Sequence, residues 1–205
     1  TRPPGFCVGC PERPVFAAMK LVEKDVGKYH VSADIGCHTF STLPPFNIGH
    51  TVLGYGLGLA SNSAVHPMFG RSSVTIMGDG GFWHNGLTTS VANAVFNKDD
   101  GILVIMKNGY SSATGTQELP SSPYHSEYKA NDMSIERALQ GLGVSWMRTV
   151  HTYHVGEMRQ TLKDAMTASY PGLKVIVADG ECQLERQRRI RPETGRKLAG
   201  GERVV

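Results

Sequence analysis

The stretch Val74-Thr75-Ile76-Met77-Gly78-Asp79-Gly80-Gly81-Phe82-Trp83-His84 decides the fold. An apolar, β-branched run breaks into a glycine turn, and an amphipathic segment follows the turn. This order predicts a strand at residues 73–77 that leads into a helix at residues 84–96. In an open parallel sheet, such a junction lies at the carboxyl edge, where ligands bind.

Short β-branched runs alternate with amphipathic segments along most of the chain, which is typical of βα units. We therefore expect an α/β fold with a mainly parallel open sheet and helices on both faces. A Pro-rich loop at 42–46 and a Ser/Thr/Gly/Pro-rich segment at 108–131 interrupt the pattern, and a loop as long as the second is functional or disordered. The expected strands are 29–35, 73–77, 102–106, 144–149 and 173–178, and the expected helices are 13–24, 51–65, 84–96, 134–142 and 155–169.

Composition favours one globular domain over residues 1–184, since the 205 residues are 40% hydrophobic and include 24 glycines. The sequence starts with Thr1 and shows neither a membrane-length apolar run nor a secretory leader, so we expect a soluble, cytoplasmic fragment with no membrane partner. The net charge of +3 comes from residues 185–205, which hold seven Lys/Arg and three Glu. Because no aromatic residues interleave with these charges, we predict a basic connector or docking tail, not a nucleic-acid site.

The glycine turn carries the elements of a phosphate site. Gly78, Gly80 and Gly81 let the backbone approach a phosphate, and the helix start offers free N–H groups. Asp79 would repel a bare phosphate, but Mg²⁺ binds a carboxylate together with diphosphate oxygens. A second ligand should end the adjacent strand, where Asn108 offers a side-chain oxygen and Tyr110 a main-chain carbonyl. Each feature alone also occurs in ordinary turns, whereas the combination at this spacing favours a cofactor site.

Four cysteines form a second group of candidate ligands. Cys7 and Cys10 share one turn, and Cys37 and Cys182 each follow a predicted strand, so all four can meet at the edge that carries Asp79. A thioredoxin-like CxxC needs a preceding strand, which is absent here. Unrelated core cysteines, a Zn²⁺ site and an iron-sulfur cluster all remain open from the residues alone.

The GDG turn followed by a helix, a strand and Asn resembles the signature of thiamine diphosphate enzymes. In that family the Asp, the Asn and a carbonyl two residues later hold Mg²⁺ against the diphosphate, which corresponds to Asp79, Asn108 and Tyr110. With the cysteines included, the chain resembles the catalytic domain of the 2-oxoacid:ferredoxin oxidoreductases, most closely the long fused bacterial indolepyruvate ferredoxin oxidoreductases. The resemblance covers about residues 3–191 and rests on Cys7-Val8-Gly9-Cys10-Pro11, Asp34-Ile35-Gly36-Cys37, Gly78 to His84, Ala113-Thr114-Gly115-Thr116-Gln117 and Glu181-Cys182-Gln183-Leu184.

The resemblance implies thiamine diphosphate, Mg²⁺ and a [4Fe-4S] cluster on Cys7, Cys10, Cys37 and Cys182. It implies oxidative decarboxylation of a 2-oxo acid such as indolepyruvate, acyl transfer to coenzyme A, and electron transfer to ferredoxin. It also implies partner domains: a pyrimidine-type thiamine domain, which supplies the activating glutamate that we do not find here, and a ferredoxin-type or gamma domain. Alone, the chain should bind metal and diphosphate weakly and turn over nothing.

Four further side-chain features are candidate functional groups, and each also has an ordinary structural explanation. His38 and His84 suit acid/base work or phosphate contact, but capping histidines are common. Thr114 is the preferred cofactor contact of the long loop, although Thr also forms turns. Phe82-Trp83 suits either an aryl pocket or the core.

Two other functions fit parts of the sequence. A non-redox thiamine diphosphate decarboxylase or synthase domain would use the GDG site without a cluster. A zinc-stapled, non-catalytic α/β module would use the cysteines and treat the GDG only as a turn.

Overall fold

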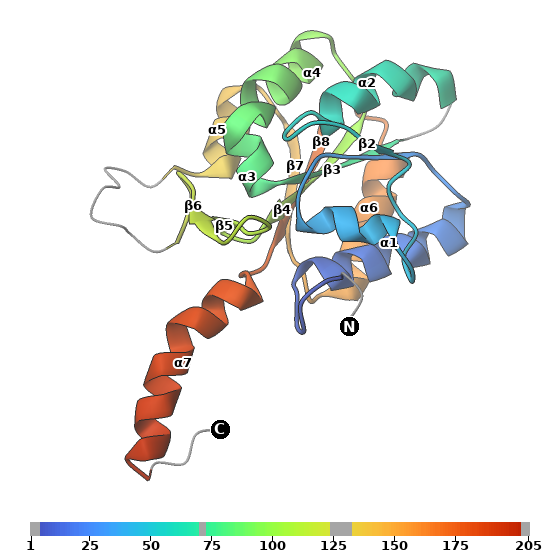
Figure 1. Cartoon of the computed structure of the whole chain (residues 1–205). Helices are drawn as coiled ribbons and strands as arrows, with labels where there is room; N and C mark the ends of the chain where they lie inside the picture. Colours follow the sequence, from blue (N-terminus) through green and yellow to red (C-terminus); the bar gives the residue numbers. More distant parts are fainter. Residues whose placement is uncertain (1–4, 70–72, 124–132, 202–205) are drawn as a thin grey trace.

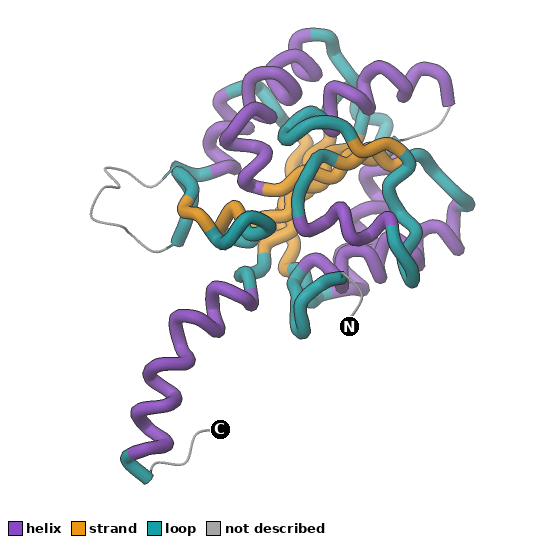
Figure 2. The backbone as a smooth tube through the Cα atoms, viewed as in Figure 1, coloured by secondary structure: helices purple, strands orange, loops and turns teal. Residues whose placement is uncertain are grey.

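The computed structural model describes residues 5–69, 73–123 and 133–201. Its centre is a parallel six-stranded sheet in the order β2-β1-β3-β4-β8-β7, and β5 pairs with β6 in a small antiparallel ribbon beside it (Figures 1 and 2). The strands are β1 (Val31–Ala33), β2 (Thr51–Val52), β3 (Val74–Gly78), β4 (Ile102–Lys107), β5 (Tyr110–Ser111), β6 (Gln117–Glu118), β7 (Trp146–His151) and β8 (Lys174–Asp179).

The helices connect the strands in βα order, as the sequence pattern predicts. They are α1 (Glu12–Val26), η1 (Cys37–Thr42), α2 (Gly58–Phe69), α3 (Asp79–Gly81), η2 (Phe82–Ala92), α4 (Asn93–Phe96), α5 (Ile135–Gly141), α6 (Val155–Thr167) and α7 (Gln183–Ala199). The segments α3, η2 and α4 follow one another without a break, and the middle one has π-helical geometry. In the part of the chain that the structure describes, no helix is long and apolar enough to cross a membrane.

Side chains that alternate along the strands build two cores. Ile102, Val104 and Met106 of β4 join α1 and α6 in one cluster, whereas Leu103 and Ile105 join α2, η2, α4 and α5 in the other. All five side chains are at most 1% exposed. Because strand side chains alternate between faces, the continuous apolar run of β4 requires helices on both sides. The predicted α/β class is confirmed.

The first third of the chain departs from the prediction. The predicted helix at 51–65 is wrong in its first part, where Thr51–Val52 form an edge strand that pairs with β1, and α2 begins only at Gly58. Gly54 and Gly56 have φ of 30° and 79°, which excludes a regular helix there. The sheet therefore has six strands, not five, and the strand predicted at 29–35 is limited to Val31–Ala33.

The glycine turn and the long loop also differ from the prediction. The helix predicted at 84–96 begins at Asp79, directly after β3, so the glycine turn is itself the first helical turn. The segment 108–131 contains β5 and β6, and residues 124–131 lie outside the described residues.

The tail predicted at 185–205 lies mostly in α7, which extends away from the body of the molecule and has no buried residue (Figure 1). Residues 202–205 lie outside the described residues.

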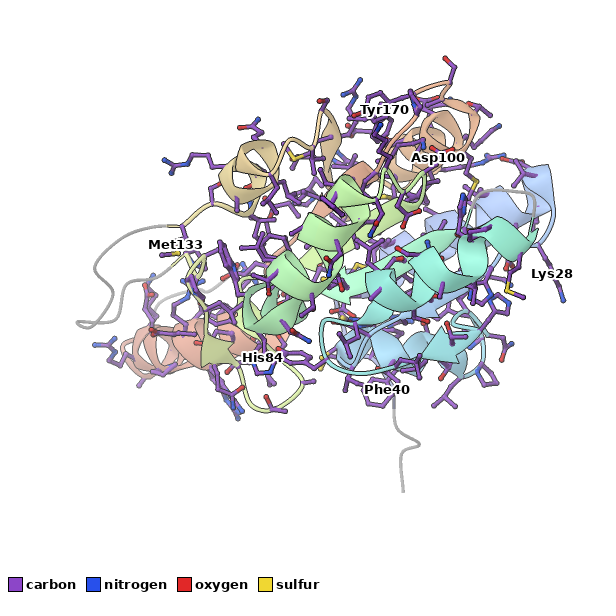
Figure 3. All side chains as sticks on the ribbon, turned by 90° about the horizontal axis from the view of Figure 1, so that it is seen from above. Lys28, Phe40, His84, Asp100, Met133 and Tyr170 are labelled. Atoms are coloured by element: carbon purple, nitrogen blue, oxygen red, sulfur yellow. The ribbon has the colours of Figure 1, made fainter. Side chains whose placement is uncertain are left out.

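The two ends of the sheet are chemically different. Asp100 and Tyr170 precede β4 and β8, and they lie at the end opposite His84 and Phe40 (Figure 3). The carboxyl ends of β1, β3, β4 and β8 lead to Asp34, Asp79, Asn108 and Cys182. The polar residues of interest therefore gather at one end, as expected for a parallel sheet.

Candidate cofactor site

Asp79 and Asn108 follow neighbouring strands. Gly78 of β3 pairs with Met106 of β4, so both residues emerge at the same edge. The Asp79 carboxylate accepts hydrogen bonds from the Gly80 N–H at 3.0 Å and from the Gly109 N–H at 2.6 Å. The turn after β4 is thus attached directly to the turn after β3, and both residues line one cavity.

The Asp79 carboxyl group lies in an environment that disfavours its charged form. It is 1% exposed, and burial raises its pKa from the ordinary 3.8 to about 7, against the opposing effect of the Gly109 and Gly80 N–H groups. A buried carboxylate is stabilised by a metal cation. Its environment therefore suits a cation that restores the charged form.

The other predicted metal-binding atoms converge on one hydroxyl group. The Ser112 hydroxyl lies 2.9 Å from Asn108 Oδ1 and 3.3 Å from the Tyr110 carbonyl oxygen. Asn108 Oδ1 also accepts a hydrogen bond from the Tyr110 N–H at 3.1 Å. Carboxylate, amide and carbonyl oxygens are the hard ligands that Mg²⁺ prefers, so the donor set fits this ion.

The glycines of the turn are required by close packing. A Cβ atom on Gly80 would collide with the Tyr55 hydroxyl and lie 3.0 Å from Ser111 Oγ, and one on Gly81 would collide with the Asp34 carboxylate. Gly78, Gly80 and Gly81 line the cavity where a helix begins, which is the part of a fold that binds phosphate. These glycines fit a diphosphate.

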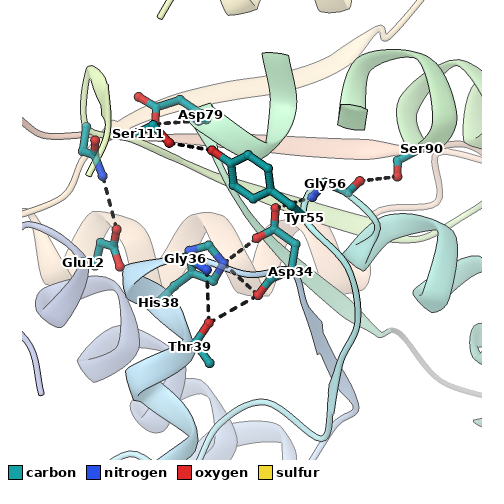
Figure 4. Close-up of polar contacts among 12 residues, drawn as sticks. Glu12, Asp34, Gly36, His38, Thr39, Tyr55, Gly56, Asp79, Ser90 and Ser111 are labelled. Carbon is teal, nitrogen blue, oxygen red and sulfur yellow. Dashed lines mark hydrogen bonds and ion pairs between the residues drawn. The ribbon is translucent and has the colours of Figure 1, made fainter. Parts of the chain in front are cut away.

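His38 and Asp34 form a buried pair beside the cavity (Figure 4). Both side chains are at most 1% exposed, and Asp34 Oδ2 also accepts a hydrogen bond from the Gly56 N–H at 2.9 Å. Burial disfavours the charged imidazole, but the hydrogen bond and charge of Asp34 outweigh it, so the pKa of His38 is raised above 6.5. His38 lines the cavity, as a candidate acid/base group must.

The other predicted contacts lie in different places. Thr114 lines the cavity and donates to Gln117 Oε1 at 2.7 Å. His84 is exposed, outside the cavity lining, with its ring 5.0 Å from that of Tyr55. Phe82 is fully buried in the core, while Trp83 Nε1 donates to Ser121 Oγ at 2.7 Å.

Tyr55 is a cavity residue that the sequence reasoning missed. Its hydroxyl lies 2.7 Å from Ser111 Oγ, so the side chain connects the loop before α2 to the segment after β4 (Figure 4). In the sequence this tyrosine stands between Gly54 and Gly56, in a segment that we predicted to be helical.

The base of α7 holds the loop that lines the cavity. Thr116 has a left-handed backbone with φ 65°, and its hydroxyl donates to Glu185 Oε2 at 2.9 Å and accepts from Arg188 at 2.8 Å. The residues after Cys182 therefore contact the loop that contains Thr114. The predicted tail has a local structural role at its start.

All four cysteines are free thiols that line a second cavity. Burial raises the pKa of Cys10 to about 12 and also raises that of Cys37, so both are protonated without a metal. Within residues 5–69, 73–123 and 133–201, no three His, Cys, Asp or Glu side chains stand in a ready metal-binding arrangement. The thiols share a cavity, and thiolate ligation would require deprotonation and a local shift.

Glu12 is the second residue that sequence reasoning missed. It is the first residue of α1, directly after Cys10-Pro11, and is 3% exposed. It lines both the cavity of Asp79 and the cavity of the cysteines, which also share Cys37, Asn108 and Ser112. Burial raises its pKa above the ordinary value.

The parallel sheet, the glycine turn and the hard-oxygen donor set define a diphosphate-binding α/β domain. Residues 34–178 match the family of thiamine pyrophosphate enzymes, specifically their C-terminal TPP-binding domain, and the chain belongs to this family. The segment extends from Asp34 to the last residues of β8, so it contains Asp79, Asn108 and Tyr110.

Curated relatives are larger proteins. The chain is 32% identical over 186 residues to the indolepyruvate oxidoreductase subunit IorA of Archaeoglobus fulgidus, covering 89% of this chain and 29% of the relative. It is 28% identical over 206 residues to the subunit of the same name from Pyrococcus horikoshii, covering 94% of this chain and 31% of the relative. The chain thus spans about a third of the length of these relatives and is distantly related to the family of indolepyruvate oxidoreductases.

Solved structures share the fold. A 2-oxoglutarate:ferredoxin oxidoreductase from Magnetococcus marinus, determined with 2-oxoglutarate, coenzyme A and succinyl-CoA bound, superposes with a TM-score of 0.75 at 18% identity, over 89% of this chain and 65% of that one. A thiamine diphosphate-dependent 4-hydroxybenzoylformate decarboxylase from Rhodococcus jostii RHA1 gives 0.58 at 17% identity, over 89% and 35%. These similarities support the thiamine diphosphate-binding fold.

Proposed function

We propose that this chain is the pyrophosphate-binding domain of a 2-oxoacid:ferredoxin oxidoreductase of the indolepyruvate type. In this proposal residues 1–184 form the domain and residues 185–205 connect it to, or dock it against, the next one. The observation that carries it is the shared wall of the two cavities, because Glu12, Cys37, Asn108 and Ser112 line both. A diphosphate-metal site and a set of four thiols would then be immediate neighbours.

The proposal assigns binding residues to each cofactor. Gly78, Gly80, Gly81 and Thr114, which line the cavity, would surround the diphosphate, while Asp79, Asn108 and the Tyr110 carbonyl would hold Mg²⁺. The thiamine, when bound, supplies the carbon nucleophile and electron sink for decarboxylation of a 2-oxo acid. A [4Fe-4S] cluster would be held by Cys7, Cys10, Cys37 and Cys182, which line the second cavity.

The overall chemistry requires partners. In the proposed reaction, one 2-oxo acid would lose CO₂ and two electrons, its acyl group would pass to coenzyme A, and two ferredoxins would each accept one electron. The cluster, when bound to the four cysteines, would supply the one-electron path. His38, buried beside the cavity and paired with Asp34, holds a proton near the reacting groups. A pyrimidine-type thiamine domain supplies the activating glutamate, and a ferredoxin-type or gamma domain receives the electrons. A reducing cytoplasm would keep the four thiols available.

Reconstitution tests the redox half of the proposal. The chain is incubated anaerobically with iron and sulfide, and its absorption and EPR spectra are recorded before and after reduction. We expect a [4Fe-4S] signal that Cys182→Ala abolishes. A cluster-free protein would contradict the redox reaction and favour a non-redox decarboxylase, and one zinc per chain after aerobic purification would favour a zinc-stapled module.

Calorimetry tests the cofactor half. Titration of the chain with thiamine diphosphate in the presence of Mg²⁺ should release or absorb heat, and Asp79→Ala should abolish the binding. The non-catalytic alternative predicts no binding heat at any accessible concentration.

A further inference from the structure

We propose that Glu12 orients the amide of Asn108 toward the divalent cation, which makes it a positioning residue of the site. This inference rests on the proposed function, because it concerns the Mg²⁺ that would accompany the diphosphate. It adds a residue outside the GDG-and-Asn motif, supplied by a different helix.

The position of Glu12 is unusual for a glutamate. A carboxylate in the first turn of a helix is favoured by the helix dipole and is ordinarily solvent-exposed. Glu12 is instead 3% exposed at the start of α1, so the chain loses the hydration of this side chain. A buried carboxylate without a compensating interaction is strongly unfavourable, which indicates that its environment serves a purpose.

The two oxygen atoms of Glu12 have different surroundings. Oε1 accepts a hydrogen bond from Asn108 Nδ2 at 3.3 Å, a contact between residues 96 positions apart. Oε2 is buried and has no hydrogen-bond partner among the described residues. The Asn108 amide is therefore the hydrogen-bond partner of this carboxylate among the described residues, and the charge of His38 also stabilises it.

The Asn108 amide has a donor end and an acceptor end, and each is assigned. Oδ1 accepts from the Tyr110 N–H at 3.1 Å and from the Ser112 hydroxyl at 2.9 Å, while Nδ2 donates to Glu12. A rotated amide would place Oδ1 against a carboxylate and Nδ2 against the Tyr110 N–H, which are two repulsive contacts. Glu12 therefore keeps the amide oxygen on the side of the Tyr110 carbonyl.

The contribution of Glu12 becomes important when a cation binds. Oδ1 must then be shared between the cation and the Tyr110 N–H, so this N–H no longer defines the amide orientation by itself. An acceptor at Nδ2 maintains the orientation and increases the negative charge on Oδ1. Outer-shell partners of this kind change metal affinity by about 10-fold to 100-fold.

The test is a titration of the full chain with Mn²⁺ in the presence of excess thiamine diphosphate, followed by EPR of the free ion. Glu12→Gln retains an acceptor for Nδ2 in a side chain of the same shape, and we expect its Mn²⁺ dissociation constant to lie within about 3-fold of wild type. Glu12→Leu has no acceptor, and we expect affinity at least 10-fold weaker. Glu157→Leu, the same change at the exposed first turn of α6, is the matched control.

The outcomes separate the inference from the proposed function. If wild type and Glu157→Leu both fail to bind Mn²⁺ with thiamine diphosphate, the proposed function fails. If both bind and Glu12→Leu binds equally well, only the role of Glu12 is overturned. A Glu12→Gln variant as weak as Glu12→Leu would also overturn it, because charge and not the hydrogen bond would then matter. Circular dichroism monitors folding, and Glu12→Ala replaces Glu12→Leu if leucine does not fit.

Discussion

Replacement of Asp79 by Asn should stabilise the ligand-free chain while destroying its cofactor site. Each pKa unit corresponds to about 1.4 kcal/mol, so the rise of the Asp79 pKa from 3.8 to about 7 makes the charged carboxylate unfavourable by about 4 kcal/mol above pH 7. Asn is neutral and avoids this cost. The amide NH₂ group of Asn cannot accept, so one of the two backbone N–H groups is left without an acceptor, which costs about 2 kcal/mol.

The net expectation is a gain of about 2 kcal/mol at pH 8, or a rise in Tm of about 4 to 8 °C for a chain of this size. The sign follows from linkage: a carboxyl whose folded pKa is raised loses stability as pH rises from its unfolded to its folded pKa. The advantage of Asp79→Asn should therefore be absent at pH 4 and appear between pH 4 and 7. Thermal unfolding across this range, followed by circular dichroism, measures it.

Bound cofactor should make wild type more stable than Asp79→Asn, the reverse of the order without cofactor. At 100 times its dissociation constant, thiamine diphosphate with Mg²⁺ should stabilise wild type by about 2.7 kcal/mol and Asp79→Asn by nothing. Asp164→Asn makes the same change on the exposed face of α6 and should alter neither curve. If Asp79→Asn is less stable than wild type at pH 8, or if its effect does not depend on pH, the assignment of a buried charge at Asp79 is refuted.

Two further substitutions probe the packing around the site. Gly81→Ala should lower the free energy of unfolding by about 1 to 3 kcal/mol, because its Cβ would meet the Asp34 carboxylate. Gly156→Ala in α6 has open space and should raise the free energy of unfolding by up to about 1 kcal/mol. Equal stability of the two variants in denaturant unfolding would contradict the close approach of Gly81 to Asp34. Asp34→Asn should remove the charge that raises the His38 pKa, so NMR titration should find a lower pKa, and breaking the buried pair should cost about 3 to 5 kcal/mol at neutral pH. That cost should shrink as pH rises through the folded pKa of His38, and an unchanged His38 titration would show that the pair is not coupled.

The parts of the fold set by local chemistry were predictable. The apolar run of β4 requires burial on both faces, and the glycine turn after β3 requires a strand-to-helix junction. Adjacent strands then place Asp79 and Asn108 at one edge, which follows from topology alone. The predicted helix at 51–65 failed because Thr51–Val52 gain their partners from β1, an interaction that composition does not reveal.

The parts set by tertiary packing were not predictable. Glu12 looks like an ordinary acidic residue at a helix start, and only the folded structure shows that it is buried against Asn108. Tyr55 reaches Ser111 across 56 residues, from a loop whose glycines resemble a Gly-rich helix in sequence. The start of α7 looks like a solvated basic tail, yet Glu185 and Arg188 hold Thr116.

The central claim is that one edge of the sheet carries a divalent cation with diphosphate and a cluster on four cysteines as neighbours. The most direct test uses the chain after its cluster has been reconstituted and reduced. The electron spin relaxation of the cluster is measured with Mn²⁺ and thiamine diphosphate added. The claim predicts that Mn²⁺ accelerates this relaxation only when thiamine diphosphate is present, and that Asp79→Ala removes the effect. A cluster whose electron spin relaxation is unchanged by bound Mn²⁺ would contradict the claim.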